Sequence, residues 1–467
     1  MAKSYKTPGV YIEETPRFSP SIPGVSTAVP AFIGFTQKDS RDDHSLINVP
    51  TKISSMLEFE RIFGKPKPQH ISVLLDADQQ LAAEVITDPL QFRLYYSLQL
   101  YFDNGGGSCY VCSAGIYPPV IAADEIFSAL QKALASTATQ ADITLLVLAD
   151  ALLSGEDNFY ALYRQALLQC NSLQNRFVII DVFTQSAVES FSDLQESFRD
   201  KIGNEHLKYG AAYYPYLHTK YRPLVVETDE KIAIGDVIYK LAVPDDASAD
   251  DLAFSLYHQN RALYDSIKTS LEHATLVMPP SGAVAGIYYN VDHSRGVWKA
   301  PANVSVNSVI KPMVSITNGE QDDMNVHLSG KSVNAIRSFP GKGTLLWGAR
   351  TLAGNDNEWR YIPVQRLFLF VNESVKLAIQ PFVFEPNDAT TWLRVKAMLE
   401  NFLMQLWRQG ALAGAKPEQA YFVKVGLHYT MTVQDILDGR LRIELGLAPV
   451  RPAEFILTLF SIKMAGS

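Results

Sequence analysis

The sequence is poor in cysteine, with three in 467 residues, and it lacks long apolar runs. Three thiols cannot form a disulfide framework in a chain of this size, so we expect synthesis in a reducing compartment. The longest apolar stretches, such as 143–149, fall far short of the roughly 20 residues that a membrane helix needs. Lys3, Lys6 and Glu13 leave no room for the apolar centre of a signal peptide. We therefore expect neither a cleaved leader nor direct membrane insertion.

Positive charge is also in deficit, because 41 lysines and arginines face 49 acidic residues and the net charge is −8. An acidic chain is a poor binder of nucleic acid, so we expect no nucleic-acid partner. Hydrophobic residues make up 47% of the chain and charged residues 19%, which excludes a disordered protein. At about 150 residues per domain, the length predicts two to four structural units.

Motifs for catalysis or metal binding are missing as well. Cys109 and Cys112 match CxxC, but they fall within a predicted strand, where their side chains point to opposite faces. The glycines at 105–107 lack the Lys-Ser/Thr that completes a phosphate loop, and the histidines form no HExxH pair. We therefore expect no enzyme activity, no cofactor and no bound metal.

The sequence does have an unusual design at both ends, where a strand is joined to the body by a proline-containing spacer. Prolines at 16, 20 and 23 forbid a helix, and residues 15–26 could span on the order of 35 Å. Pro449 and Pro452 form the corresponding C-terminal spacer. The residues that we expect to pair as terminal strands are Val10, Tyr11, Ile12, Glu13, Phe455, Ile456, Leu457, Thr458 and Leu459.

A single strand cannot satisfy its own backbone, so each terminal strand must pair with a sheet. Residues 455–462 are apolar on both faces, which suits insertion between two covered surfaces. Two strands on tethers favour strand addition between subunits. Folding of both arms onto their own domain is the equally weighted alternative.

Strand-like and helix-like segments alternate through the middle of the chain. Apolar runs at 142–149 and 176–182 flank a helix at 157–173, as in a βαβ unit with both sheet faces covered. Further expected elements are a strand at 31–35, a helix within 90–102, a strand at 109–112, a helix near 187–203, a strand at 211–214 and one helix from Asp250 to about 272.

The last third is expected to be rich in loops up to about residue 360, followed by a strand and helix at 361–373. Asn387-Asp388 can cap a long helix that ends at Gly410, and a strand follows at 440–447. On the long helix apolar residues recur at i, i+3, i+4 and i+7, which predicts one buried stripe. Arg394, Lys396 and Arg408 lie off that stripe.

Several motifs, in order along the chain, are similar to those of the contractile tail sheath proteins of phages, R-type bacteriocins and extracellular contractile injection particles. They cover both termini and most of the last 190 residues, whereas residues 120–270 carry none. The motifs are KTPGVYIEE at 6–14, YFDNGGG at 101–107, a longest signature made of PPSG at 279–282, VAG at 284–286 and RGVWKAPAN at 295–303, then FEPND at 384–388, LWRQGAL at 406–412 and APVRPAEF at 448–455.

The resemblance implies an α/β (α+β) fold with a mixed-sheet core domain, an inserted α/β outer domain and extended N- and C-terminal strand-donating arms. The expected divisions are an N-terminal arm 1–26, a first core part 27–119, the outer domain 120–272, a second core part 273–447, and the C-terminal spacer and donated strand 448–467.

The resemblance further implies a structural sheath subunit that stacks as hexameric rings around an inner tube by strand addition between subunits. Its contraction would drive the tube through a target envelope. The implied partners are further copies of the chain in a helical homopolymer, the inner tube protein, paralogous sheath proteins, and baseplate or cap proteins. Such particles are assembled in the bacterial cytoplasm and become a phage tail or a released extracellular particle.

An inward helix of sheath proteins contacts the tube, and the resemblance implies that role for Arg394, Lys396 and Arg408. Ordinary solvated helix charges are the alternative reading of these three residues. The competing function for the whole chain is an α/β enzyme with its site at the carboxyl ends of the strands near 149 and 182. Rings or cylinders in electron micrographs would distinguish a sheath from such an enzyme.

Overall fold

The computed structural model describes residues 22–76, 78–87, 89–184, 191–234, 237–244 and 246–454. The described chain divides into two compact units. Among the described residues, the large unit contains Val25–Glu373 and 451–454, and the small unit contains Ser374–Val450 and 22–24. The expected terminal strands at 10–13 and 455–459 lie outside the described residues.

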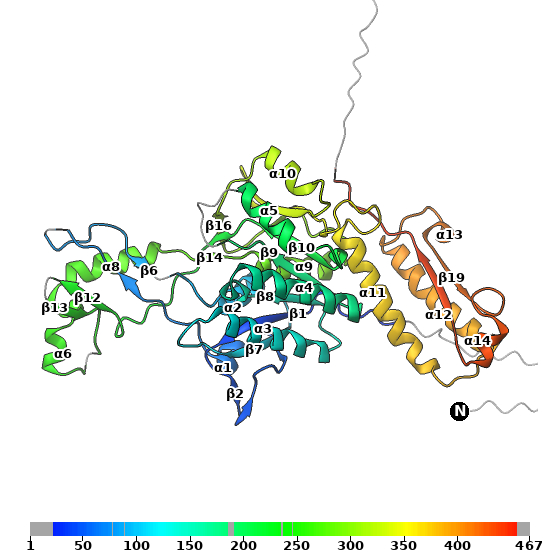
Figure 1. The fold of residues 1–467 in the computed structure, drawn as a ribbon, viewed down its shortest axis with the longest axis horizontal. Coiled ribbons are helices and arrows are strands. Elements are labelled where there is room, and N and C mark those ends of the chain that lie inside the picture. Colours follow the sequence, from blue (N-terminus) through cyan, green and yellow to red (C-terminus); the bar gives the residue numbers. More distant parts are fainter. Residues whose placement is uncertain are drawn as a thin grey trace, which may run out of the picture. The chain divides into compact units, whose positions relative to one another are not determined.

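The large unit is built on a nine-stranded mixed sheet (Figure 1). Its central strands are parallel to one another, and β18, β15 and β4 pair antiparallel at the edges. The order across the sheet is β15 (Val304–Ser305), β18 (Gly343–Trp347), β17 (Val333–Phe339), β10 (Gly210–Tyr214), β9 (Phe177–Asp181), β8 (Leu145–Leu148), β1 (Pro30–Thr36), β7 (Cys109–Ile116) and β4 (Thr51–Ile53). The expected mixed α/β class is confirmed.

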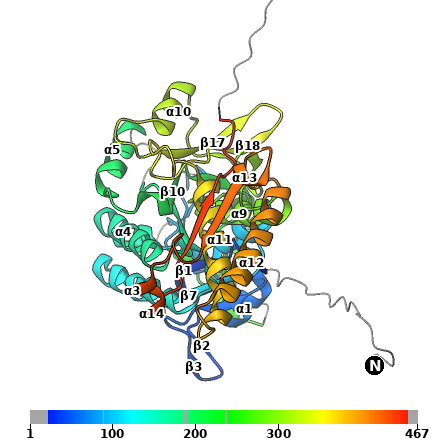
Figure 2. The ribbon, with the colours of Figure 1, turned by 90° about the vertical axis from the view of Figure 1, so that its right-hand side faces the viewer.

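Helices cover both faces of this sheet. Every residue of β1, β8, β9 and β10 is buried, as near-continuous apolar strands require. Helices α3 (Ala123–Ser136) and α4 (Glu156–Leu173) lie on one side of the strands, and α9 (Ser281–Arg295) lies on the other (Figure 2). Helix α2 (Leu94–Asp103) packs against α9.

A small lobe projects from one end of the large unit (Figure 1). We call it the peripheral lobe, and it comprises the described residues of 70–87 and 225–273. It has its own apolar cluster, whose members include Ile71, Ile232 and Leu263. Its elements are β5 (Ile71–Ser72), β6 (Ile86–Thr87), β12 (Lys231–Ile234), β13 (Val237–Lys240), α6 (Ala249–Ala253), α7 (Leu256–Gln259) and α8 (Arg261–His273).

The remaining elements of the large unit are short or peripheral. Strand β11 pairs antiparallel with β14 and with β16. These elements are α1 (Met56–Phe63), β2 (Ser40–Arg41), β3 (His44–Ser45), α5 (Phe191–Lys201), β11 (Leu217–Thr219), β14 (Val277–Met278), β16 (Val309–Pro312) and α10 (Asn318–Asn325). Among the described residues, the helices are either too short or too polar to cross a bilayer.

The small unit is a helix packed on a two-stranded sheet. Asp388 accepts a hydrogen bond from the Thr391 N–H and caps α12 (Ala389–Arg408), as its sequence predicts. Helix α12 packs on β19 (Tyr421–Val425), which pairs antiparallel with β20 (Ile443–Leu447). Shorter elements are α13 (Pro417–Ala420) and α14 (Val433–Leu437), and α11 (Ile362–Ile379) runs from the large unit into the small one.

Part of the segment expected as the outer domain contributes strands to the main sheet. Strands β8, β9 and β10 belong to the expected outer domain 120–272, yet they lie at the centre of the sheet that contains β1 and β7. The reason is that each of these strands is buried on both faces and needs parallel neighbours on both sides. The part of that segment in the peripheral lobe has an apolar cluster of its own.

Three local expectations are wrong. The helix expected over 250–272 is broken into α6, α7 and α8, because Asn260 leaves helical geometry and its side chain caps α8. Residue 361 makes an isolated bridge and does not begin a strand, since α11 starts at Ile362. The stretch expected to be loops before residue 360 contains α9, α10 and the β17–β18 hairpin.

Candidate assembly site

The root of the N-terminal arm is held by a buried arginine. Arg366 of α11 donates a hydrogen bond to the Thr27 carbonyl at 2.9 Å. The same guanidinium forms a two-pronged ion pair with Asp292 of α9, and both side chains are at most 4% exposed. The Tyr288 ring lies 4.6 Å from the guanidinium carbon. The main chain just after the proline-rich spacer is therefore fixed to the large unit.

The root of the C-terminal arm is held by a second buried arginine. The Glu454 carboxylate accepts hydrogen bonds from Arg350 Nε at 2.9 Å and Nη2 at 2.6 Å, from Asn325 Nδ2 at 2.9 Å and from the Tyr361 hydroxyl at 3.2 Å. Arg350 also donates to the carbonyls of Asn325 and Gly354. Burial alone would raise the pKa of Glu454, but the hydrogen bonds from Arg350 and Asn325 lower it below its usual value. The carboxylate is therefore ionised at neutral pH.

The two-stranded sheet of the small unit offers backbone groups on both of its edges. The Ala448 N–H donates to the Ala420 carbonyl at 2.8 Å, in register with the β19–β20 ladder. Because hydrogen-bonded pairs alternate in an antiparallel ladder, every second residue turns its N–H and C=O away from the partner strand. These residues are 421, 423 and 425 on β19 and 443, 445 and 447 on β20.

The Tyr421 N–H closes the last turn of α13 by donating to the Pro417 carbonyl. Within the described ranges, no such backbone bond is seen for the outward groups of 423, 425, 443, 445 and 447. A two-stranded ribbon is marginal on its own in water, and its unpaired edges are templates for further strands. Its inner face is covered, since Tyr421 and Val423 are buried while Phe422 and Lys424 face outward. The small unit thus has the geometry of a strand acceptor.

The three cations of α12 do not form one patch. Arg394 and Lys396 are two residues apart, which places them about 200° apart around a helix. Arg394 lies 3.5 Å from Glu385, and Lys396 lies 3.8 Å from Glu400. Arg394 and Arg408 are exposed and share one side of the helix, roughly 21 Å apart along its axis.

The acidic groups at the carboxyl ends of β8 and β9 hold backbone segments in place. Asp150 accepts hydrogen bonds from the N–H groups of Phe35, Arg93 and Leu94. Asp181 accepts from the Ser281 N–H at 3.0 Å and hydroxyl at 2.6 Å, which caps α9. Burial raises the pKa of Asp150 to about 6 and that of Asp181 to about 7. Both carboxylates are therefore occupied in structural contacts at the place where an α/β enzyme would have its site.

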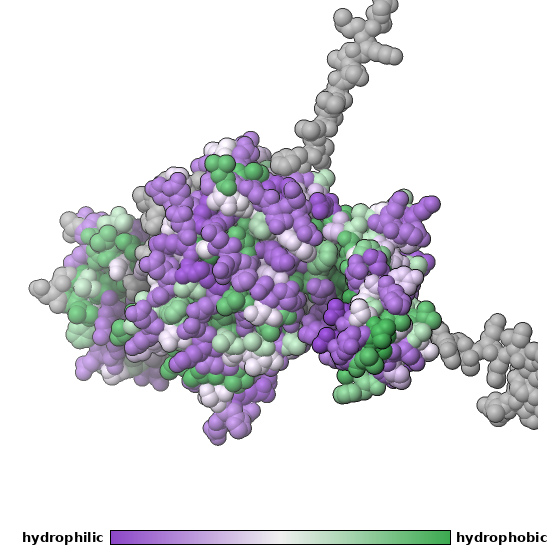
Figure 3. All heavy atoms as spheres, turned by 45° about the vertical axis from the view of Figure 1, so that its right-hand side comes forward, coloured by the Kyte–Doolittle hydropathy of each residue, from purple (hydrophilic) through white to green (hydrophobic). Residues whose placement is uncertain are grey.

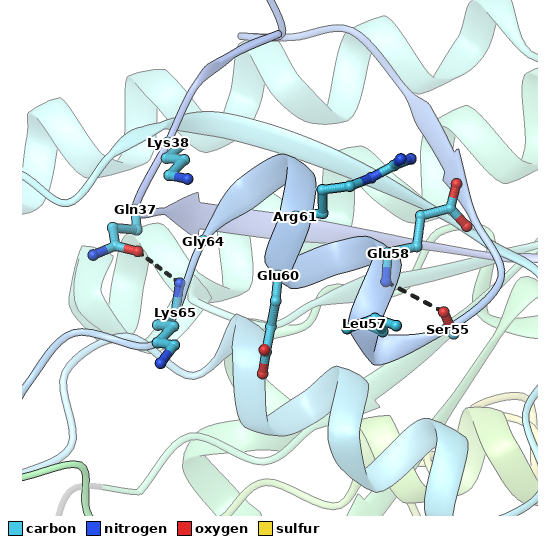
Figure 4. A pocket seen from close by; sticks show the side chains of 9 residues that line it. All are labelled: Gln37, Lys38, Ser55, Leu57, Glu58, Glu60, Arg61, Gly64 and Lys65. Carbon is cyan, nitrogen blue, oxygen red and sulfur yellow. Dashed lines mark hydrogen bonds between the residues drawn. The ribbon is translucent and has the colours of Figure 1, made fainter.

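Other candidates for chemistry carry no reactive arrangement. Cys109, Cys112 and Cys170 are buried free thiols, and burial raises the pKa of each. The hollow beside α1 is lined by charged side chains that point in different directions (Figure 4). Two of its polar groups are used locally, since Gln37 accepts from the Lys65 N–H and Ser55 from the Glu58 N–H. The described part of the chain contains no cluster of residues that could hold a metal ion.

The PPSG and VAG motifs form part of a tight helix crossing. Gly282 and Gly286, four residues apart on α9, face Ser97 and Tyr101 of α2. A Cβ at Gly282 would lie 2.5 Å from the Ser97 carbonyl oxygen, and one at Gly286 would lie 2.4 Å from that of Tyr101. Only glycine permits two backbones to approach so closely. The glycines of PPSG and VAG therefore serve packing inside the large unit.

Sequence reasoning missed the two arginines that hold the arm roots. Arg350 and Glu454 are 104 residues apart, and Arg366 is 339 residues from Thr27. A single arginine is part of no recurring residue spacing, so neither contact could be predicted from the sequence pattern. Glu454 does lie within the C-terminal motif, which gave the only hint.

Comparisons with known proteins agree with this architecture. Residues 354–463 match the family described as phage tail sheath C-terminal domain. The tail sheath protein of Vibrio phage KVP40 is 24% identical over 138 residues, which make up 29% of this chain and 20% of the phage protein. The matched segment therefore spans only a fifth of that relative.

Three solved structures are similar over nearly the whole chain. The PVC sheath complex of an extracellular contractile injection system, in the contracted state, is 30% identical, covers 98% of both chains and has a TM-score of 0.64. A chain of the anti-feeding prophage baseplate is 31% identical, covers 99% of this chain and 100% of that one, with a TM-score of 0.64. The contracted helical sheath of the anti-feeding prophage is 31% identical, covers 98% and 99%, and has a TM-score of 0.63. On this similarity, the chain belongs to the contractile tail sheath protein family and is a sheath subunit of a contractile injection system.

Proposed function

We propose that the subunit polymerises as stacked hexameric rings around an inner tube, joined by strands that each subunit donates to its neighbours. The observation that carries this proposal is the β19–β20 ribbon, whose two edges have outward backbone groups without a partner in the described residues. Two edges match two donated strands, one from the N-terminal arm and one from the C-terminal arm. During contraction, the folded parts of neighbouring subunits would move while the strand pairing between them persists. This movement would drive the tube through a target envelope.

The surface of the small unit supports a role in assembly. Apolar side chains gather on it in the space-filling view (Figure 3). Large exposed apolar patches mark interaction surfaces. The exposed members in this unit are Leu377, Val383, Phe384, Leu393, Phe422, Tyr429, Val433 and Leu437. Partners of this surface would be further copies of the chain, the inner tube, and baseplate, cap or paralogous sheath proteins.

We further propose that the particle is a released extracellular injection device and that the subunit is structural, without enzymatic activity. The PVC and anti-feeding prophage chains match at 30–31% identity over almost their whole length, whereas the phage relative matches over a fifth of its length. Electron microscopy of the purified protein tests the assembly. We expect rings or long cylinders, and a small discrete oligomer at every concentration would contradict the proposal.

The proposed tube contact of α12 gives a salt-dependent prediction. Reversing Arg394 and Arg408 to glutamate should weaken assembly of extended sheath on tubes, because these two cations share one side of the helix. Each exposed ion pair contributes about 0–1 kcal/mol, so the loss should be largest at low salt. Co-sedimentation with tubes measures it.

The matched control is Lys396→Glu, on another side of α12, with the same change of charge. It should reduce tube binding less than the double reversal does. Equal loss in both variants, or no loss at low salt, would show that the helix does not grip the tube through Arg394 and Arg408.

We propose that the peripheral lobe, which contains part of residues 120–272, faces outward, away from the tube. The lobe has its own apolar cluster, and Asp246 and Ser248 are exposed in its loop. A short peptide tag inserted between Ala247 and Ser248 should leave both assembly and contraction unchanged. Negative-stain microscopy of tagged cylinders measures this. Folded tagged protein that forms no cylinders would place the lobe at an interface.

A further inference from the structure

The C-terminal arm leaves the large unit at a built socket. Glu454 is the last described residue, and its carboxylate meets Arg350, Asn325 and Tyr361. The Arg350 side chain is 4% exposed and that of Glu454 is 20% exposed. We propose that this socket, here called the arm anchor, fixes the register in which the C-terminal strand pairs with a neighbouring subunit. The inference rests on the proposed strand donation.

The arm anchor shortens the free chain between the folded units and the C-terminal strand. The last contact of the small unit in this segment is the hydrogen bond from the Val450 N–H to the Ala411 carbonyl, at 3.2 Å. If Glu454 were free, residues 451–454 would add roughly 13 Å of slack at about 3.3 Å per residue. With Glu454 held, the strand can begin at Phe455 directly. The root of the strand therefore has one position on the large unit.

The strand itself does not specify its register. A strand with one apolar and one polar face resists a one-residue slip, because the slip turns every side chain to the wrong face. Residues 455–462 read FILTLFSI and are apolar on both faces, so such a slip costs them little. The N-terminal strand differs, because Val10 and Ile12 alternate with Tyr11 and Glu13. The C-terminal strand, which lacks this alternation, is the one that begins directly after an anchored residue, Glu454.

The anchor also directs tension away from the small unit. A pull on the donated strand is transmitted to the first fixed point of the chain, which is the Glu454 carboxylate in its socket. Breaking one partner of a buried ion pair is strongly unfavourable, because the other charge stays buried and unpaired. Residues 448–450, which hydrogen-bond to 411 and 413 beside the acceptor ribbon, are thereby shielded from that pull.

Disulfide cross-linking tests the register. Thr458→Cys is combined in turn with cysteine at Phe422, Lys424, Arg442 or Glu444, which are exposed positions of β19, β20 and the residue before β20. The three native cysteines are buried and should not interfere. In assembled cylinders of the otherwise unchanged chain we expect one dominant cross-link. In the Glu454→Gln background we expect the cross-link to spread to the position two residues away.

A pair of insertions tests the anchor with its ion pair intact. One glycine inserted after Glu454 displaces the strand by one residue from the anchor, so the dominant cross-link of Thr458→Cys should be lost while cylinders still form. One glycine inserted after Arg451 precedes the anchor and should leave the critical concentration within about twofold. In Glu454→Gln chains the two insertions should become equivalent, and the critical concentration should rise roughly fivefold from the added slack.

The outcomes separate the anchor from the proposed function. Cylinders whose cross-link stays at one position in Glu454→Gln chains, or whose cross-link changes equally with both insertions in the otherwise unchanged chain, would overturn the anchor alone. An unchanged chain that never forms rings or cylinders would overturn strand donation and the anchor with it. Thermal unfolding of each variant monomer identifies a folding defect, and the insertions decide the question if Glu454→Gln proves unstable.

Discussion

A chain that lacks residues 1–20 should fold as a monomer and lose polymerisation altogether. The described core of the large unit begins at Ala28, so its burial does not depend on the deleted residues. In the proposed assembly, residues 10–13 would supply backbone groups for the edge of a neighbouring β19–β20 ribbon, and the truncated chain would lack them. Removal of residues 455–467 should have the same effect, with Glu454 retained. Circular dichroism measures folding, and sedimentation with electron microscopy measures polymerisation.

A single substitution sharpens this test. Ile12→Pro removes a ladder N–H and clashes with strand pairing, so it should abolish cylinders. Ile12→Val keeps the β-branched shape at the same position and should assemble normally. Full-length cylinders from the proline variant, or from either truncated chain, would show that the arms do not join subunits. Truncated chains that fail to fold would instead support arms that pack on their own domain.

The parts of the fold that sequence could predict are those with local signals. Strands β8 and β9 are short apolar runs that flank an amphipathic helix, and such runs have few alternative structures. Helix α12 combines a capping Asp388 with an unbroken apolar stripe, and its start agrees with the expectation. In these segments local propensity, capping and the burial pattern all favour the same secondary structure, and tertiary packing does not change it.

Helix α9 could not be predicted because its sequence lacks a helical period. Residues Ser281 to Tyr288 are all buried, so apolar and small residues occur on every side. A helical period is recognised from the alternation of an apolar and a polar face, and this segment has no polar face. In addition, Pro280 and two glycines favour a turn when tertiary contacts are absent. The close crossing with α2 makes this glycine-rich segment a helix.

The candidate site shows the same division. The arms and their spacers were predicted from proline and alternation, which act locally, and the terminal strands stay a prediction because they lie outside the described residues. The Arg350 and Arg366 contacts depend on side chains brought together from distant segments. The cationic set on α12 was read from charge alone, and helix geometry places Lys396 away from Arg394.

The helix crossing provides the prediction with the largest effect on stability. Gly286→Ala would place a Cβ 2.4 Å from the Tyr101 carbonyl oxygen and 2.9 Å from the Asn104 Cβ. Backbone cannot move as a flexible side chain can, so α2 and α9 must separate. Overpacking of a buried contact costs about 1–3 kcal/mol, and we expect a value near 3 kcal/mol or more. Urea unfolding of the monomer, followed by circular dichroism, measures the change in free energy.

Gly319→Ala is the matched control, because Gly319 also lies in a helix, α10, but a Cβ there would have no atom within 4 Å. Alanine has the higher helix propensity by about 1 kcal/mol, so this variant should be as stable as the original chain or slightly more so. Gly282→Ala, which meets the Ser97 carbonyl oxygen at 2.5 Å, should resemble Gly286→Ala. If all three variants unfold at the same urea concentration, α2 and α9 do not pack as closely as a 2.4 Å approach requires. Gly282 and Gly286 must then serve something other than packing.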